Sequence, residues 1–500
     1  MKELRGILIP CIALFVGIAL SDRPCGQSQS TIVPAAHSVT LNPCRLPNIE
    51  GELGCGSYEV FENRETRRGR KIALKILVLP SLSARGPSEA LFILAGGPGQ
   101  AATENAQFFA STFAAVRRER DIVMIDQRGT GGSNPLRCDL AAGNGLQKYF
   151  GDLFPLEAVR RCREQLELKA DLRLYTTPIA MDDLDEVRSA LGYERIDLFG
   201  TSYGTRAALV YLRRHPDHAR SVILKGVVPM SLVLPHVIAR DAQRSLNLLF
   251  KDCAADKSCR QMFPNLRRES EVVLERLNKE PSRASLVDPS TSKVEQVEIS
   301  RGVFATTLRS LLQNITTTNQ VPSLIHQGFE HDFEPFARLA LSIRRGAADS
   351  LSYGMFLSVL SSEDIPLTSK EVVARESNGT FLGDYYARQV MQASAIWRRG
   401  ERPRGYNQPV RSNLPVLLIS GYLDPATPPS GAAETARHLP NSLHLLIRNA
   451  SHSYAGLSPC VDKIMAEFIE KGSPKGLDTS CTAEIQRAPF ANALTSGASP

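Results

Sequence analysis

A serine flanked by glycines at positions 200 to 204 is the feature of the sequence with the clearest chemical meaning. The run reads Gly200-Thr201-Ser202-Tyr203-Gly204. A Gly-x-Ser-x-Gly match arises by chance in about one chain in six of this length, so the run alone is weak evidence. It follows an apolar strand pattern and opens a helical pattern, which is the setting of a nucleophile elbow. Ser202 is therefore the predicted nucleophile of an acyl-transfer reaction.

Two later residues have the types and positions needed to activate this serine. A serine hydroxyl needs a base that accepts its proton and an acid that orients the base, and after an elbow the acid precedes the histidine. Asp424 follows the apolar run 415–420, and His452 follows the apolar run 442–447. Taken singly, each has an ordinary explanation, because aspartate before proline is common in turns and histidine is common in surface loops. Together with Ser202 they predict a catalytic triad.

A glycine-rich turn supplies a candidate oxyanion hole. The charge that develops on the attacked carbonyl is stabilised by fixed backbone N–H groups. The run 95–99 (AGGPG) follows an apolar strand pattern and can supply one donor near Gly97, while the amide of Tyr203 supplies the other. A phosphate-binding loop is the competing interpretation. It fails because the run lacks a Gly-Lys-Ser/Thr ending and no Gly-x-Gly-x-x-Gly opens the helix.

Alternating strand and helix patterns position these residues. Strands are expected at 57–62, 71–80, 89–94, 121–126, 195–199, 221–227, 415–420 and 442–447, and helices at 156–170, 178–191, 203–214, 431–438 and 461–470. Thr177 is the expected N-cap of the helix 178–191, with Pro178 at its first position. Strands that alternate with helices of this length indicate a mostly parallel, doubly wound sheet of the α/β class.

The alternation stops near residue 230 and resumes near residue 411. The intervening segment is mostly helical in pattern, with proline-punctuated joints such as Phe263-Pro264 and Val321-Pro322. An insertion late in the sheet is therefore expected. The predicted organisation is a signal peptide over 1–28, a first part of the core over 29–229, a helical cap over 230–410, and a second part of the core with the C-terminal tail over 411–500.

The first residues have the layout of a secretory signal peptide. Lys2 and Arg5 precede an apolar stretch over 6–20, and polar residues follow it. This stretch is shorter than a membrane span requires. Cleavage after Ser21 or near Ser28 fits the small residues there, and an uncleaved anchor helix is the alternative. We expect a secreted or periplasmic protein with no stable membrane span once the signal is removed.

The cysteines indicate disulfides. The sequence has 10 cysteines, of which Cys11 and Cys25 lie in or beside the leader. The other cysteines form neighbours along the chain, namely Cys44 and Cys55, Cys138 and Cys162, Cys253 and Cys259, and Cys460 and Cys481. In an exported chain such an even set favours disulfides, and we hypothesise that these neighbours pair. Neither the doubled Cys-x-x-Cys spacing nor the histidine clusters of a zinc site are present, so neither a metal ion nor a cofactor is expected.

Composition and charge argue against a nucleic-acid partner. The chain has 43% hydrophobic and 22% charged residues, which is typical of a globular protein. The net charge of +7 is spread over 59 basic and 52 acidic residues. The one dense basic run, 64–71 (RETRRGRK), would suit nucleic acid or an anionic membrane. We interpret it as a solvated turn between two strands, since no aromatic residues interleave with a basic stripe.

With these motifs in place, the sequence closely resembles the peptidase S33 group of α/β-hydrolases, which includes proline iminopeptidases and exported tripeptidyl aminopeptidases. The likeness spans roughly residues 44–490 and is carried by 96–99 (GGPG), 126–133 (DQRGTGGS), 200–206 (GTSYGTR), 423–428 (LDPATP) and the loop with His452. The resemblance implies an α/β-hydrolase fold, a helical cap over the active site, and cleavage of short peptides from a free N-terminus.

The resemblance also implies roles for residues of the cap. The run 361–364 (SSED) is similar to the Cys-x-Glu-Asp run of the family, whose acidic cap residues bind the α-amino group of the substrate. Glu363 is therefore the candidate amine-binding residue, and an exposed acid at a helix end is the alternative. Ser361 and Ser394 stand where relatives have cysteines, which suggests that a cap disulfide has been lost and that substrate choice is wider.

The leading functional hypothesis is an exported, monomeric serine aminopeptidase that releases short N-terminal peptides or single residues through an acyl-enzyme at Ser202. An exported carboxylesterase acting on small esters is the alternative, because the same catalytic groups serve both reactions. A binding module without catalytic activity is the alternative from another class.

Overall fold

The computed structural model describes residues 39–83, 89–141, 143–453 and 459–491. The predicted signal peptide over 1–28 lies outside the described residues. The strands are β1 (Leu41–Cys44), β2 (Leu53–Phe61), β3 (Lys71–Leu79), β4 (Ala90–Leu94), β5 (Asp121–Ile125), β6 (Ile196–Thr201), β7 (Ala219–Lys225), β8 (Ser282–Val287), β9 (Val294–Ile299), β10 (Val416–Gly421) and β11 (Ser442–Ile447). The helices are α1 (Ala106–Thr112), α2 (Leu156–Glu167), α3 (Thr177–Ala190), α4 (Tyr203–Arg214), α5 (Leu234–Ala255), α6 (Lys257–Met262), α7 (Leu266–Lys279), α8 (Arg301–Gln313), α9 (Ile315–Thr318), α10 (Val321–Phe329), α11 (Glu334–Ser350), α12 (Tyr353–Glu363), α13 (Lys370–Ser377), α14 (Tyr385–Ala395), α15 (Pro429–Ala436) and α16 (Pro459–Lys471).

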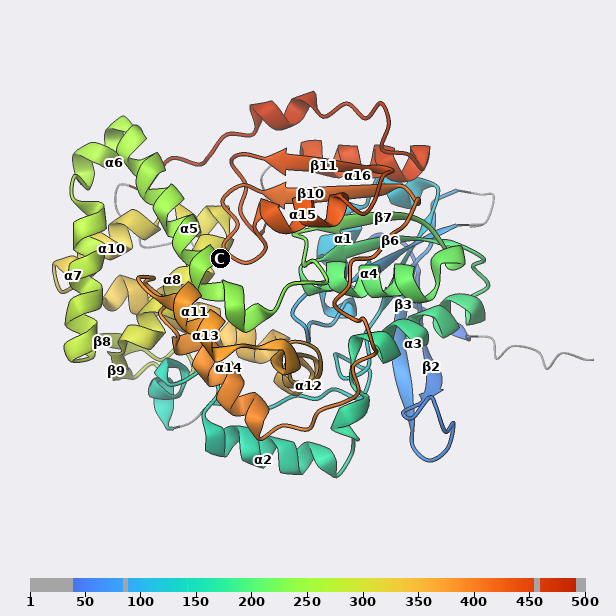
Figure 1. The fold of residues 1–500 in the computed structure, drawn as a ribbon, viewed down its shortest axis with the longest axis horizontal. Coiled ribbons are helices and arrows are strands. Elements are labelled where there is room, and N and C mark those ends of the chain that lie inside the picture. Colours follow the sequence, from blue (N-terminus) through green and yellow to red (C-terminus); the bar gives the residue numbers. More distant parts are fainter. Residues whose placement is uncertain (1–38, 84–88, 142, 454–458, 492–500) are drawn as a thin grey trace, which may run out of the picture. The chain divides into compact units, whose positions relative to one another are not determined.

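A mixed sheet of nine strands lies at the centre of the described residues, in the order β1-β2-β3-β5-β4-β6-β7-β10-β11 (Figure 1). The strands from β5 to β11 in this order pair in parallel. Strand β2 pairs antiparallel with both β1 and β3, and β3 pairs antiparallel with β5. Helices connect the parallel strands, since a parallel pair needs a long crossover. The predicted fold class, a mostly parallel α/β sheet, is confirmed.

Strand β4 shows how the core is built on both faces of the sheet. All of its residues are buried, and alternate side chains point to opposite faces. Ala90, Phe92 and Leu94 belong to the apolar cluster formed with α3 and α4. Leu91 and Ile93 belong to the cluster formed with α1 and α16. A strand covered on both faces must be apolar throughout, and this explains the continuous run that predicts it.

The chain between β7 and β10 forms helices α5 to α14 (Figure 1). An apolar core of its own is formed by α5 to α8, α10 and α11, whereas apolar side chains of α12 and α14 belong to the cluster formed with α3 and α4. Phe304 and Phe336 stack in that core with their ring centroids 4.6 Å apart. Leu146 and Phe150, from the segment before α2, and Phe490, near the C-terminus, pack into the same cluster. The core of the insertion therefore includes side chains from outside the 230–410 range.

A two-stranded hairpin interrupts these helices, which the sequence analysis did not anticipate. Strands β8 and β9 pair antiparallel in full register from Ser282 opposite Ile299 to Val287 opposite Val294. In β9 exposure alternates with burial, so the segment has the two-residue period of a strand. The insertion as a whole is mostly helical, and the hairpin is a short exception whose two-residue alternation the prediction did not separate from its surroundings.

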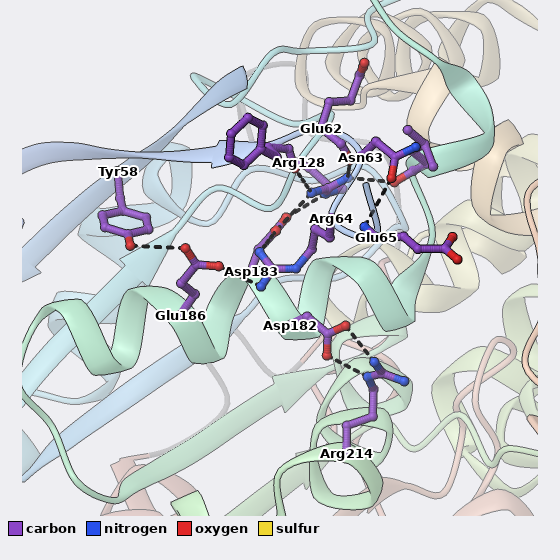
Figure 2. A network of polar contacts seen from close by, with 12 residues as sticks. Tyr58, Glu62, Asn63, Arg64, Glu65, Arg128, Asp182, Asp183, Glu186 and Arg214 are labelled. Atoms are coloured by element: carbon purple, nitrogen blue, oxygen red, sulfur yellow. Dashed lines mark hydrogen bonds and ion pairs between the residues drawn. The ribbon is translucent and has the colours of Figure 1, made fainter. Parts of the chain in front are cut away.

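Arg128, in the middle of the 126–133 run, organises a buried polar network (Figure 2). Its side chain is fully buried and binds both carboxylate oxygens of Asp183, with donor–acceptor distances of 2.6 and 2.9 Å. It also donates to the backbone carbonyls of Glu62 and Leu174. Arg64, from the turn between β2 and β3, reaches the same Asp183 carboxylate at 2.8 Å. Arg128 thus ties that turn to helix α3 and has a structural role.

Replacing Arg128 by methionine is expected to lower the free energy of unfolding by about 3–5 kcal/mol, because it leaves buried acceptors without their donors. Arg64→Met is the matched control, since Arg64 contacts the same carboxylate but is partly exposed to solvent. Its loss is expected to cost at most about 1 kcal/mol. Urea denaturation of the two variants measures the difference, and equal losses would contradict the structural role of Arg128.

Four disulfides join the cysteines that are neighbours along the chain, namely Cys44–Cys55, Cys138–Cys162, Cys253–Cys259 and Cys460–Cys481. These are the same pairs that the sequence analysis hypothesised. Disulfides form in oxidising compartments outside the cytosol. Over the described residues, no helix has both the length and the apolar character that crossing a bilayer requires.

Candidate active site

Ser202 lies on a sharp turn between β6 and α4. Its φ of 54° is in the region that side chains other than glycine avoid, and such backbone strain is typical of nucleophile elbows. The flanking glycines are required by close packing. A Cβ at Gly200 would overlap the carbonyl group of Gly204, and a Cβ at Gly204 would overlap the carbonyl group of Leu94. The amide of Ser202 donates to the backbone oxygen of Lys225 at 2.9 Å, which anchors the elbow to β7.

Asp424 and His452 come together from the loops that follow β10 and β11. The Nδ1 atom of His452 lies 2.8 Å from Oδ2 of Asp424. The hydroxyl of Thr427 donates to the same oxygen at 2.7 Å and lies 3.0 Å from the histidine nitrogen. The loop of His452 is held by the insertion, because Ser451 donates through its hydroxyl to the carbonyl of Leu312. The acid and the ring are thus fixed relative to each other.

The carboxylate of Asp424 is ionised although it is fully buried. Burial alone would raise its pKa. The charge and hydrogen bond of His452, together with donors from Thr427, outweigh burial and lower the pKa of Asp424 to about 2. The second oxygen of the carboxylate accepts the backbone N–H groups of Ala426 and Thr427 at 2.7 and 2.8 Å. A permanent negative charge beside Nδ1 favours the tautomer with its proton there and stabilises a protonated ring.

The glycine-rich turn after β4 lies against the nucleophile. A Cβ built on Gly96 would be 3.3 Å from the Cβ of Ser202. Gly97 has a φ of +108°, and a Cβ there would be 2.7 Å from the amide of Gly99, so this backbone requires glycine. Tyr203 is the first residue of α4, and its N–H has no acceptor within the helix. Both predicted oxyanion donors therefore belong to segments that adjoin Ser202.

Asp126 holds the segment that follows this turn. Its carboxylate accepts the backbone N–H and the hydroxyl of Thr103, each at 2.9 Å. It also accepts the N–H of Gly132 at 2.9 Å, within its own loop. The run 126–133 therefore has a structural role. Arg128 holds helix α3, and Asp126 holds the chain that follows the glycine-rich turn 95–99.

Ser202, Tyr203, His452 and Gly97 all line one cavity of about 1040 Å³. Ligand sites in proteins commonly enclose about 300–1,000 Å³, so this cavity has room for a peptide of several residues. Side chains from α8, α11, α12 and α14 line it opposite the sheet, including Arg309, Arg344, Phe356 and Tyr386. The insertion therefore contributes to the wall of the site.

Glu363, the predicted amine-binding residue, does not line this cavity; its side chain is only 1% exposed. Its carboxylate accepts the backbone N–H of Thr177 at 2.7 Å and the hydroxyl of Thr177 at 2.9 Å. The hydroxyl of Tyr406 donates to it as well. Burial raises the pKa of Glu363, while these donors and Arg206 oppose that shift. The structure contradicts the prediction, because the carboxylate of Glu363 is buried away from the cavity and accepts three hydrogen bonds from within the protein.

The same contacts correct the expected start of α3. The helix begins at Thr177 rather than after it, and Thr176 is its N-cap, with no capping bond from the side chain. Thr177 instead bridges Glu363 to Tyr203, whose hydroxyl lies 2.7 Å from the threonine oxygen. Glu363 therefore supports, through Thr177, the side chain of Tyr203, the residue after Ser202.

Glu363→Gln is expected to lower the free energy of unfolding by about 1–3 kcal/mol. Both carboxylate oxygens of Glu363 accept hydrogen bonds, so the NH₂ group of a glutamine would replace one acceptor and face a donor from Thr177 or Tyr406. The KM for N-terminally free peptides is expected to stay close to its original value. Glu371→Gln, at an exposed glutamate of the same insertion, is the control. Thermal or urea unfolding together with peptide kinetics tests this. A raised KM confined to free N-termini, with stability unchanged, would restore the amine-binding role.

The predicted loss of a cap disulfide concerns two buried serines. Ser361 on α12 and Ser394 on α14 are both fully buried. Among the described residues, neither hydroxyl has a hydrogen-bond partner. A cysteine is better suited than a serine to such an apolar position.

Two residues beside the triad were not singled out from the sequence. Thr427 contacts both Asp424 and His452, and its place within the 423–428 run was the signal that could have identified it. Lys225 ends β7 and lines the cavity. Burial lowers the pKa of Lys225 to about 8, against the attraction of Asp462 and Asp424. Nothing in the sequence around Lys225 indicates this position.

Among the described residues, Asp185, His215 and His218 are one group whose ligand atoms lie within 4.8 Å of one another. Arg188 occupies this place, because its guanidinium binds Asp185 at 2.8 Å and lies 3.1 Å from His218. A fixed positive charge at that position repels a divalent cation. We assign no metal to this group.

Two family models match the chain on either side of the insertion's centre. The model described as alpha/beta hydrolase fold matches residues 89–261, and the model described as TAP-like protein matches residues 379–481. The first includes the Gly97 turn and Ser202, and the second includes Asp424 and His452.

Known proteins similar to the chain include two bacterial peptidases. The serine protease Hip1 of Mycobacterium tuberculosis is 24% identical in an alignment of length 531 that covers 95% of each chain. The tripeptidyl aminopeptidase of Streptomyces lividans is 28% identical over 202 residues, or 36% of each chain. Among solved structures, the proline iminopeptidase of Mycobacterium smegmatis is 15% identical, with a TM-score of 0.40, over 83% of this chain and 98% of the other.

Proposed function

Because the protein is a serine hydrolase of the α/β-hydrolase fold, related to the serine proteases and aminopeptidases of peptidase group S33, we propose that it is an exported aminopeptidase. It removes single residues or short peptides from the free N-terminus of peptides. In this proposal Ser202 is the nucleophile, His452 the base, Asp424 the acid that orients the base, and the amides of Gly97 and Tyr203 form the oxyanion hole.

The reaction proceeds in two acyl transfers. The Ser202 oxygen bonds to the scissile carbonyl carbon while its proton passes to His452. The oxyanion forms beside the Gly97 and Tyr203 amides, and the C–N bond breaks as His452 returns the proton to the leaving amine. A water molecule then loses a proton to His452 and attacks the ester carbonyl, and the C–O bond to Ser202 breaks as His452 returns the proton to the Ser202 oxygen, which releases the N-terminal product. The ionised Asp424 stabilises the protonated ring in both steps.

One observation carries the proposal: the strained Ser202 and His452, whose ring contacts Asp424 at 2.8 Å, line a single cavity whose far wall comes from the insertion. The cap that the resemblance implied, over 230–410, supplies this wall. A cavity of this size has room for a short peptide, which is compatible with an exopeptidase. The relatives named serine protease and tripeptidyl aminopeptidase support a peptide substrate.

A substrate ammonium needs a carboxylate partner, and Glu363 is not accessible to it. The carboxylates that line the cavity are Asp139, Asp152, Asp349 and Asp364. Asp364 is buried and bound to Arg206 at 2.7 Å, while Asp139 and Asp349 are exposed. We therefore place the amine-binding role among the cavity aspartates.

Export is part of the proposal, with a secreted or periplasmic location and a monomeric state. The four disulfides support an oxidising compartment. The leader-like sequence over 1–28 supports cleavage after export. N-terminal sequencing of the secreted product, together with its mass in solution, tests both statements.

The proposal is tested by comparing kcat/KM for matched peptides with free and acetylated N-termini. We expect efficient hydrolysis of the free peptide and a loss of at least about tenfold on acetylation, since one charged hydrogen bond disappears. Equal rates on both peptides would refute N-terminal recognition. Hydrolysis of small esters without hydrolysis of peptides would establish the carboxylesterase alternative.

A further inference from the structure

Two arginines of the insertion point to a second recognition element in the cavity. Arg309 on α8 and Arg344 on α11 both contribute to its lining. Throughout the part of the chain that the structure describes, neither guanidinium forms an ion pair with a carboxylate. Among the same residues, the Nε of Arg309 is buried without a hydrogen-bond partner. Two cations thus line the cavity without a carboxylate of the described residues in direct contact with them.

The two side chains lie at the same face of helix α8. Arg344 donates to the hydroxyl of Thr306 at 2.9 Å and to the backbone oxygen of Gly151 at 3.0 Å. Thr306 stands one turn before Arg309, and residues three apart lie on the same helix face. Thr306 also lines the cavity. Arg344 therefore reaches across to the face that carries Arg309.

Both arginines are desolvated by their surroundings. Burial lowers the pKa of Arg309 and of Arg344, and the neighbouring tyrosines and aspartates compensate only in part. Arg309 lies over the ring of Tyr386, 5.8 Å from its centroid, which is a weak substitute for an anion. A desolvated guanidinium is stabilised best by a planar oxyanion that accepts two hydrogen bonds.

The cavity's own carboxylates do not fill this role. Asp364 is bound to Arg206. Asp152 accepts the hydroxyl of Tyr385 and the amide of Gln389, at 2.8 and 2.7 Å. Asp139 and Asp349 are exposed to solvent.

We propose that Arg309 and Arg344 bind a carboxylate group of the substrate. Two sources supply this group: the C-terminal carboxylate of a peptide short enough to be enclosed, or the side chain of an aspartate or glutamate. The inference rests on the proposed peptide substrate and adds to it a preference for peptides that carry a negative charge. The preferred substrate then has an ammonium group at one end and an anion at the cationic wall of the insertion.

Binding to the Ser202→Ala variant tests this without hydrolysis. Calorimetry compares three N-terminally free peptides of one neutral sequence: one with a free C-terminus, one amidated, and one amidated with glutamate in place of a neutral residue. We expect amidation to weaken binding at least about tenfold if the C-terminus is the anion, or glutamate to strengthen it by as much if a side chain is. Equal affinities for all three peptides overturn the inference, and this series changes neither arginine.

Variants in the same background then assign the effect. Arg309→Met and Arg344→Met are expected to remove the preference for the peptide that carries a carboxylate, while their affinity for the amidated peptide without a carboxylate stays within about threefold. Arg345→Gln is the matched control, because Arg345 is the next residue on α11 and does not itself line the cavity; its guanidinium lies over the ring of Tyr149, 5.8 Å from the centroid. Equal weakening of all peptides by Arg309→Met and Arg344→Met would overturn the inference.

Hydrolysis by the protein with Ser202 separates the two proposals. Efficient cleavage of charged and amidated peptides alike would leave the aminopeptidase proposal standing and remove the preference for anions. If the three peptides differ in affinity but none of them is cleaved, the binding of a carboxylate by Arg309 and Arg344 stands and the aminopeptidase proposal fails.

Discussion

Replacing Ser202 by alanine is expected to lower kcat for peptide hydrolysis by about 10⁴- to 10⁶-fold. The reason is that no other hydroxyl can take the position of a side chain held on the strained elbow between β6 and α4. Peptide affinity should change little, because the cavity and its charged groups remain. Steady-state kinetics and calorimetry on the same peptide measure the two effects separately.

Ser310→Ala is the matched control for this variant. Ser310 also lines the cavity, but it stands on α8 and donates to the backbone oxygen of Thr306 within its own helix. It is expected to retain most of the activity. A loss at position 310 comparable to that at 202, or substantial hydrolysis by Ser202→Ala, would contradict the assignment of the nucleophile.

Asp424→Asn is expected to lower kcat by about 10⁴-fold without unfolding the protein. An asparagine that keeps its oxygen toward the backbone N–H groups of Ala426 and Thr427 turns its NH₂ group toward His452. The ring then carries its proton on the wrong nitrogen and lacks the negative charge that stabilises its protonated form. Kinetics at several pH values and a urea unfolding curve for the variant test this expectation.

The graded control is Thr427→Val. This change removes one donor to Asp424, the hydroxyl at 2.7 Å, but keeps the carboxylate and its contact with His452. We expect a loss of about tenfold in kcat, as for one charge-assisted hydrogen bond. A loss as large as that of Asp424→Asn would show that Thr427, and not the carboxylate, fixes the ring.

The depressed pKa of Asp424 also has a consequence for stability. A carboxyl group with a folded pKa of about 2 and an unfolded pKa of about 3.9 stabilises the folded state above the higher value. That contribution is lost as the pH falls from about 4 through about 2. Asp424→Asn lacks this component, so its loss of stability over the same range is expected to be smaller.

The sheet was predictable from the sequence, and the candidate triad could be proposed from it, because both depend on local patterns. Strands buried on both faces are continuous apolar runs, as in Ala90–Leu94, and catalytic loops follow their carboxyl ends. The nucleophile, acid and histidine could be identified from the ends of three such strands. The disulfide pairs could be predicted because each joins cysteines that are neighbours along the chain, so that only short loops between them had to be assumed.

The lining of the cavity could not be predicted in this way. Every residue from Gly354 to Glu363 on α12 is buried, so no amphipathic period distinguishes the side that meets substrate from the side that carries Glu363. The partner of Glu363, Thr177, lies 186 residues away along the chain. Arg309 and Arg344 are ordinary helical arginines in the sequence, and only the packing of α8 against α11 places both at the cavity.

The central claim, that Ser202 forms an acyl-enzyme in this cavity, is tested most directly by labelling with a fluorophosphonate. The purified protein is treated with the reagent, its intact mass is measured, and the modified residue is mapped by peptide mass spectrometry. We predict one label per chain on Ser202, with labelling slowed by an N-terminally free peptide and absent in Ser202→Ala. Failure to label, or equal labelling of the Ser202→Ala variant, would contradict the account and favour a binding module without catalytic activity.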